Sequence, residues 1–266
     1  MYRVVYFFLL ICLYEVSTSK KKGIAVGPGL YKCNDTWAFK DISWWYDWHA
    51  NLDTHTRHGC LNRPNGEYVP MLWGEARMHN ATVYSISDHV LGFNEPNIKS
   101  QANMTPERAA ALWPEAEMKA SGRTLISPAV AGCDKAQHCI DWFTKFFAAC
   151  LKCRVDALAV HAYNCDAKHL VTSLETVAKH FNKKIWLTEF ACHSAKTQEQ
   201  QLHYMKQVLP LLESSLYVER YAWYETRTYK NTTFITSSTD LLDRHASTLN
   251  KLGQFYDSYK HSGIVG

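Results

Sequence analysis

The 266-residue sequence lacks the motifs that identify several large groups of proteins. Gly27-Pro28-Gly29 follows an early apolar run, but it matches neither GxGxxG nor a Walker loop, which argues against a nucleotide-binding, doubly wound sheet. There is no HExxH pair, no calcium-binding loop and no Ser-His-Asp order, and we therefore expect neither a metal nor a cofactor. Internal repeats, low-complexity tracts and Pro/Ser linkers are also missing, so the sequence predicts a single domain.

A strong excess of one charge is missing as well. The 29 lysine and arginine residues stand against 25 acidic residues, which gives a net charge of +4. Because the basic residues are not clustered, we expect no nucleic-acid partner. Aromatic residues, in contrast, make up 13% of the chain, with nine Trp and fifteen Tyr. Their rings can stack on the apolar faces of sugars, although most of them will belong to the core.

The long apolar run of this sequence lies at its N-terminus. A positive charge precedes the uncharged apolar residues 4–14, and Ser17 and Ser19 are small residues at the −3 and −1 positions of a cleavage site. This pattern predicts a signal peptide at residues 1–19. The run is shorter than the roughly 20 apolar residues of a membrane span, although an uncleaved anchor is the alternative. We expect residues 20–266 to form a secreted, extracellular protein without stable membrane insertion.

Eight cysteines remain after the signal peptide, an even number that predicts disulfides in an oxidising compartment. Four of the cysteines form two pairs that are close in sequence. Two more each end a predicted strand and can join neighbouring loops, which leaves the last two to pair with each other. The candidate pairs are Cys133 with Cys139, Cys150 with Cys153, Cys165 with Cys192, and Cys33 with Cys60. A zinc or redox site at Cys150-x-x-Cys153 is the alternative, but neither a second such pair nor a suitably spaced histidine follows it.

Four sequons agree with secretion and predict surface loops, although chance alone would supply some of them. The glycosylation candidates are Asn34, Asn80, Asn103 and Asn231.

Eight apolar runs recur along the chain with helical or loop segments between them. Each run is almost continuously apolar, as in parallel strands that are buried on both faces. The predicted strands are 23–28, 45–51, 67–73, 89–95, 124–131, 155–163, 184–190 and 219–225. Helices are predicted after Thr105-Pro106 and at 139–151, 167–182, 197–214 and 240–259, and those of the first half look short. This alternation favours a single (β/α)8 TIM barrel of the α/β class over a doubly wound sheet.

Glu95 and Glu189 each lie where a predicted strand ends. In a β/α barrel the reactive groups gather at the carboxyl ends of the strands, so these two carboxyl groups can meet at the mouth of the barrel. Cleavage of a glycosidic bond requires such a pair, one holding a proton for the leaving oxygen and the other a negative charge opposite the anomeric carbon. We therefore predict that both glutamates are catalytic.

The segments around these glutamates also carry a family resemblance. They read LGFNEPN, QANMTPERAAALW, DWFTKFFAACLKCRVDALAVHAY and KIWLTEFAC. Together with the early GPG and WYDW stretches, they resemble glycoside hydrolase family 128, a group of secreted β-1,3-glucanases with a glycosyl hydrolase catalytic core. The resemblance implies that Glu95 is the acid/base and Glu189 the nucleophile. Asn97 departs from the aspartate that is frequent in relatives, which puts only a loop contact in doubt.

From this resemblance we expect a retaining endo-β-1,3-glucanase that binds β-glucan as a monomer. Two alternatives stay open at this point. One is a non-catalytic β-glucan receptor on the same barrel, which would not need two facing carboxylates. The other is a glycosidase that acts on a β-1,4-glucan or a mannan.

Further polar and aromatic residues near strand ends are candidate substrate ligands. Tyr163 is predicted to donate to Glu189 and keep it ionised, and His161 to bond a sugar hydroxyl; the alternative is a buried histidine and a core tyrosine. Asn94 is placed to bond the 2-hydroxyl of the sugar. Cleft positions are also predicted for Trp48, Trp73, Trp223, Asn51 and Glu225, with core packing or salt bridges as the alternative.

Overall fold

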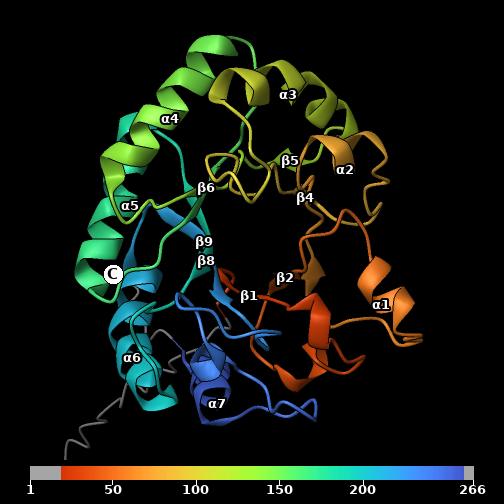
Figure 1. The fold of residues 1–266 in the computed structure, drawn as a ribbon, viewed down its shortest axis with the longest axis vertical. Helices are drawn as coiled ribbons and strands as arrows, with labels where there is room; N and C mark the ends of the chain where they lie inside the picture. Colours follow the sequence, from red (N-terminus) through yellow and green to blue (C-terminus); the bar gives the residue numbers. More distant parts are fainter. Residues whose placement is uncertain (1–18, 261–266) are drawn as a thin grey trace, which may run out of the picture.

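The computed structural model describes residues 19–260 as a barrel of parallel strands surrounded by helices (Figure 1). The predicted signal peptide, apart from Ser19, lies outside the described residues. The strands are β1 (Lys22–Ala25), β2 (Trp44–Tyr46), β3 (Glu67–Tyr68), β4 (His89–Val90), β5 (Thr124–Leu125), β6 (Val130–Ala131), β7 (Leu158–His161), β8 (Ile185–Phe190) and β9 (Val218–Tyr224).

Neighbouring strands of the barrel pair in parallel. Seven of them form one sheet in the order β3-β2-β1-β9-β8-β7-β6, and β4 pairs with β5. The isolated parallel bridges Met71–Leu91, Asn94–Ala129 and Ile126–Ala157 connect the two sheets. All eight predicted runs contain strand, and the run at 124–131 holds both β5 and β6, separated at Ser127-Pro128. The predicted (β/α)8 barrel is confirmed.

The helices are long in one half of the barrel and short in the other. The long ones are α3 (Pro106–Ala120), α4 (Ala136–Ala149), α5 (Ala167–Phe181) and α6 (Gln198–Ser214). The short ones are α1 (Asp53–Arg57), α2 (Glu75–His79), α7 (Lys251–Ser258) and the 3-10 turns η1 (Pro28–Leu30), η2 (Thr36–Ala38) and η3 (Ser237–Thr239). Within residues 19–260, no helix combines the length and apolar content that crossing a bilayer requires.

Local sequence signals explain where these helices begin. Thr105 accepts a hydrogen bond from the Arg108 amide at the start of α3, and Thr197 forms a capping box with Gln200 at the start of α6. The helix predicted at 240–259 is wrong in its first half. Asn250 caps a helix that covers only Lys251–Ser258, because the preceding segment forms an antiparallel bridge between Leu242 and Leu249.

Two apolar layers lie on opposite sides of the sheet. Trp44, Tyr46 and Trp186 belong to a cluster inside the barrel, whereas Trp45 and Trp223 belong to the larger cluster between strands and helices. Since side chains alternate along a strand, neighbouring residues of β2 and β9 face opposite layers. This alternation decides which aromatic side chains can reach the mouth of the barrel.

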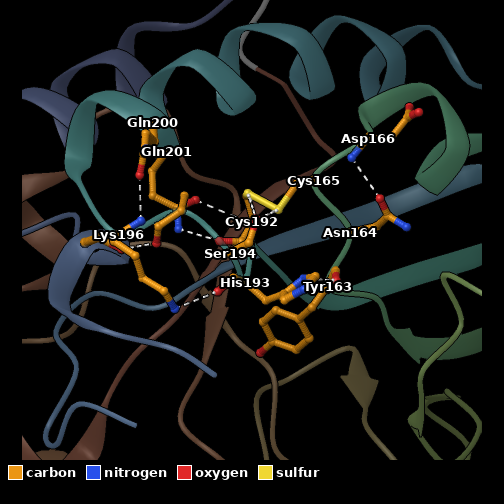
Figure 2. Close-up of a disulfide and its surroundings, with 12 residues drawn as sticks. Tyr163, Asn164, Cys165, Asp166, Cys192, His193, Ser194, Lys196, Gln200 and Gln201 are labelled. Atoms are coloured by element: carbon orange, nitrogen blue, oxygen red, sulfur yellow. Dashed lines mark hydrogen bonds between the residues drawn. A yellow bond between two sulfur atoms is a disulfide. The ribbon is translucent and has the colours of Figure 1, made fainter. Parts of the chain in front are cut away.

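The four predicted cysteine pairs are confirmed as disulfides, namely Cys33–Cys60, Cys133–Cys139, Cys150–Cys153 and Cys165–Cys192. Figure 2 shows the last of these, which joins the segments that follow β7 and β8 beside Tyr163. His193 adds a second link, because its Nδ1 lies 2.7 Å from the backbone oxygen of Tyr163. These links hold the two segments together at the mouth of the barrel.

Candidate active site

The barrel brings Glu95 and Glu189 together from opposite parts of the sheet. Glu95 follows β4, and its backbone amide donates to the carbonyl oxygen of Ala129 at 2.9 Å. Its φ of 42° lies in the left-handed region, which is uncommon for a residue with a side chain. Glu189 lies in β8, and its side chain is 7% exposed, compared with 14% for Glu95.

His161 lies between the two carboxyl groups. Its Nδ1 is 2.8 Å from Oε1 of Glu95 and 3.4 Å from Oε2 of Glu189. One ligand atom of each of the three residues lies within 4.8 Å of the others. The imidazole is completely buried, so the prediction that it bonds a sugar hydroxyl is wrong. Its contacts make it a partner of the carboxyl pair instead.

Three hydroxyl and indole groups surround the carboxylate of Glu189. The hydroxyl of Tyr163 donates to Oε2 at 2.7 Å, as predicted from its place after β7. The indole N–H of Trp48 donates to Oε1 at 2.9 Å, and the hydroxyl of Tyr46 lies 3.5 Å from the same oxygen while donating to Thr188 at 2.9 Å. Sequence reasoning placed Trp48 in the cleft but missed its bond to Glu189 and missed Tyr46 entirely.

Opposing effects act on the protonation of this cluster. Burial raises the pKa of Glu189, and the charge of Glu95 acts in the same direction. The charge of His161 and the hydrogen bonds from Tyr163 and Trp48 oppose this without overcoming it. For His161, burial lowers the pKa, but the two carboxylates outweigh it and the pKa is raised. The imidazole is therefore stabilised as a cation beside the carboxyl pair.

Asn94 and Glu225 occupy the walls of the same cavity. Asn94 is 3% exposed; its amide nitrogen donates to Gln101 at 3.3 Å, and its buried Oδ1 has no hydrogen-bond partner among residues 19–260. Glu225 directly follows β9 and lies beside Gly27, where a Cβ atom would come within 2.5 Å of the Oε2 of Glu225. Burial raises the pKa of Glu225 well above its usual value, and the charges of Glu189 and Asp240 add to this.

The remaining aromatic and amide candidates divide between the cleft and the core. Trp73 lines the catalytic cavity and carries the guanidinium of Arg77 at 4.4 Å from its ring centre. Asn51 lines an adjacent cavity, with its Oδ1 bonded to the amide of Asp53. The cleft position predicted for Trp223 is wrong. It points into the outer layer, where its indole donates to Thr239 at 2.8 Å.

Tyr224, the neighbour of Trp223, lines the cavity instead. Gln101, Tyr229 and Phe234 were likewise not predicted, because they lie on loops without a periodic signal. They line cavities that contain the glutamates. These cavities measure about 420, 400 and 440 Å³ and all include Glu95; the smaller one beside them, about 230 Å³, shares Trp48 and Trp73 with the first. We call this connected set the cleft.

Asn97 and the four sequon asparagines also have defined positions in the structure. The Asn97 side chain bonds the backbone amide and carbonyl of Ala131, both at 3.0 Å, so it makes a loop contact. The asparagines of all four sequons are exposed. Their glycosylation remains a prediction.

One group of side chains in the described part of the chain has the spacing of metal ligands, namely Glu95, His161 and Glu189. Nitrogen and carboxylate oxygens of this kind suit a divalent cation, provided that the imidazole is neutral. The raised pKa of His161 means that a cation would have to displace its proton.

A barrel with two facing carboxyl groups at the carboxyl ends of its strands defines the class of glycoside hydrolases. Residues 23–256 match the family described as glycosyl hydrolase catalytic core. The chain belongs to this family, and its structural likeness to family 128 enzymes assigns it to glycoside hydrolase family 128.

Solved structures and a curated relative agree with this assignment. An endo-β-1,3-glucanase of subgroup II from Sorangium cellulosum is 33% identical, with a TM-score of 0.73 over 90% of this chain and 98% of that one. A variant of the subgroup I endo-β-1,3-glucanase from Amycolatopsis mediterranei, in complex with laminaripentaose, is 29% identical, with a TM-score of 0.71 over 90% of this chain and 99% of that one. Alkali-sensitive linkage protein 1 of Schizosaccharomyces pombe is 30% identical over 227 residues, which are 80% of this chain and 40% of that protein. The chain therefore spans well under half the length of this relative.

Proposed function

We propose that this glycoside hydrolase is a retaining endo-β-1,3-glucanase in which Glu189 is the nucleophile and Glu95 the acid/base. The observation that carries the proposal is the closeness of the two carboxyl groups: one carboxylate oxygen of each lies within 4.8 Å of the other and of a ring nitrogen of His161. Retaining enzymes hold the pair about 5–5.5 Å apart, whereas inverting enzymes leave about 6.5–9.5 Å for a water molecule.

The surroundings of each carboxyl group support these roles. Glu189 accepts hydrogen bonds from Tyr163 and Trp48, which stabilise its negative charge and orient it for attack on the anomeric carbon. Glu95 protonates the leaving oxygen and then takes a proton from the water that releases the glycosyl intermediate. His161 donates to Glu95 and faces Glu189, so its positive charge balances whichever carboxylate is ionised in each step.

The form of the cleft supports endo cleavage of a β-1,3-glucan. Cavities extend from the carboxyl pair both toward Trp73 and toward Phe234, which leaves room for sugar units on either side of the scissile bond. Asn94 lines the cavity that contains both glutamates, and its bond to a sugar hydroxyl is part of the proposal. The linkage is proposed from the similar enzymes, which include endo- and exo-β-1,3-glucanases and a complex with laminaripentaose.

Release of reducing ends tests the proposal. We expect turnover of laminarin above carboxymethylcellulose and mannan, with early products of several lengths. Equal rates on laminarin and carboxymethylcellulose would favour a β-1,4-glucan as substrate, and binding without turnover would favour a receptor. Glucose as the sole early product would contradict endo cleavage. NMR of the first product anomer would settle the stereochemistry, since inversion contradicts the covalent intermediate.

We also propose that the enzyme acts outside the cell, as a monomer of residues 20–266. The signal-like N-terminus, four disulfides and exposed sequons support this location. Expression in a eukaryotic secretory host should place the protein in the medium with Lys20 as its first residue, and gel filtration should give the mass of one chain. Retention of residues 1–19 on a membrane-bound product would indicate the uncleaved anchor.

A further inference from the structure

A cavity larger than any of the cleft cavities lies outside the cleft. It measures about 590 Å³ and shares no lining residue with the cleft cavities. Trp37, Tyr68, Tyr84 and Ile86 form its apolar surface, and Arg63 and Asp88 are exposed beside them. We call this cavity the side groove. Tyr68 belongs to the outer layer of the barrel, so the side groove lies on the outside of the barrel wall, in the half with the short helices α1 and α2.

The exposed ring of Trp37 is held in place before any ligand binds. The side chain is 50% exposed, which is high for a residue of this size, and its indole N–H donates to the carbonyl oxygen of Arg63 at 2.8 Å. Asn65 donates to Thr36 and to Phe39, both at 2.9 Å. The Cys33–Cys60 disulfide ties the same two loops together. A rigid aromatic surface of this kind binds with little loss of conformational entropy.

The charges around the side groove balance. Glu67 is neutralised by Arg220 at 2.8 Å and bonded to His89 at 2.6 Å, so it offers no net charge to a ligand. Arg63 and Asp88 remain as exposed groups of opposite sign. The groove therefore combines flat aromatic rings with hydrogen-bonding groups and has no net charge. This combination suits a neutral, polyhydroxylated chain rather than an anionic or cationic polymer.

We propose that the side groove is a second binding site for a neutral β-glucan chain, in which a sugar ring stacks on Trp37 and its hydroxyls bond Arg63, Asp88 and the Tyr84 hydroxyl. This inference rests on the proposed glucanase function, because that function supplies the ligand class. The site would anchor the enzyme on an insoluble polymer while another segment of that polymer occupies the cleft.

Binding to insoluble β-1,3-glucan tests the proposal. Trp37→Ala, Trp37→Phe and Leu61→Ala would be made in the mature chain carrying Glu189→Gln, so that the polymer is not consumed. Leu61 is a matched control because it is fully exposed near the groove without lining it. We expect binding to fall roughly fivefold to tenfold in Trp37→Ala, as for loss of an aromatic anchor. The loss should be smaller in Trp37→Phe, which keeps a ring but loses the indole bond to Arg63, and binding should stay nearly unchanged in Leu61→Ala.

Activity on a soluble hexasaccharide separates this site from the cleft. With Glu189 intact, Trp37→Ala should hydrolyse laminarihexaose at the parental kcat/KM. Unchanged polymer binding in Trp37→Ala, equal loss in Leu61→Ala, or a parallel loss of hexasaccharide turnover would overturn the second site. Equal Trp37-dependent binding to alginate would overturn its preference for a neutral chain. If the parental enzyme hydrolyses no laminarihexaose while Trp37-dependent binding persists, the proposed function fails and the site stands.

Discussion

The two halves of the barrel are built differently. Between β4 and β9, the four helices α3 to α6, of 14 to 17 residues, lie outside the strands (Figure 1). Their buried apolar residues belong to the outer layer. The half that contains β1 to β4 has two α-helices of five residues each. There, a disulfide and a buried ion pair hold irregular loops against the wall. In this half a disulfide and an ion pair do the work that packed helices do in the other half. The outer surface of the barrel there holds the side groove.

The catalytic pair joins the two halves, since Glu95 comes from the first half and Glu189 from the second. Replacing Glu189 with alanine should lower turnover by at least roughly 10⁴-fold, because no covalent intermediate can form. Glu95→Ala should cost much less on an aryl glycoside whose leaving group needs little protonation. Azide should restore activity to the Glu95 variant with a β-glycosyl azide and to the Glu189 variant with an α product. Anomers in the reverse order would show that the roles are exchanged.

The buried ion pair tests what holds the first half in place. Arg227 bonds both carboxylate oxygens of Asp35, at 2.5 and 2.9 Å, and both residues are almost completely buried. Arg227→Ala would leave the Asp35 charge buried and should lower the free energy of unfolding by about 3–5 kcal/mol. Arg108→Ala, which breaks an exposed pair with Glu75, should leave stability unchanged in the same urea titration. Similar losses in both variants would contradict this account.

Asp240, in the loop after β9, should make the free energy of unfolding depend on pH. Burial raises the pKa of Asp240 from 3.8 to about 6, although the Thr228 amide donates to its carboxylate at 2.7 Å. A pKa that is raised on folding gives stability that is complete below the unfolded pKa and is lost as the pH rises through the folded pKa. Between pH 4 and 7 Asp240 should therefore remove roughly 2 to 2.5 kcal/mol of stability.

The Asp240→Asn variant isolates this contribution, since asparagine does not titrate. Urea titrations of both proteins at several pH values should show that the stability of the parental protein relative to the variant falls as the pH rises. A constant difference across this range would show that Asp240 keeps its ordinary pKa.

Each half of the barrel contributes one hydrogen-bond donor to Glu189. Trp48 comes from the first half and Tyr163 from the second, so variants of these two residues compare the contributions of the halves directly. Tyr163→Phe and Trp48→Phe each remove one hydrogen bond to a carboxylate, worth about 1.5–3 kcal/mol, which corresponds to a loss of roughly tenfold to a hundredfold in kcat. The shorter bond, from Tyr163, should matter more. A pH–rate profile of each variant checks the reason, because loss of a donor should raise the pKa of the nucleophile and move the acidic limb to higher pH. An unmoved limb would indicate a purely structural role.

Much of the fold was predictable because its signals are local. Continuous apolar runs mark buried parallel strands, and Thr105-Pro106 marks the start of α3. The helix predicted from residue 240 was wrong because the contacts that keep residues 240–250 out of the helix come from the folded loop around them. Local sequence signals therefore predicted that a helix or strand is present more reliably than they predicted the residues at which it begins and ends.

The site was predictable where chemistry follows from residue type. Carboxyl groups at two strand ends indicate a glycosidase pair, and cysteine spacing indicated the disulfides. The contact of His161 with Glu95 was not predicted, because it depends on which way the imidazole points between the two carboxyl groups. Trp223 points to the outer layer and Tyr224 to the cleft, because successive side chains of a strand point to opposite faces. An almost continuously apolar run does not reveal which of the two residues points inward.

By itself, the sequence determined the barrel, the position of the two glutamates at strand ends and the cysteine pairs, because each depends on residue type and spacing along the chain. Only the tertiary structure decided that His161 lies between the carboxyl groups, that Trp48 donates to Glu189 beside the predicted donor Tyr163, and that Trp37 stays exposed over a groove. These are contacts between residues that are distant in the chain. Their geometry depends on strand register and on which parts of the barrel wall the helices cover.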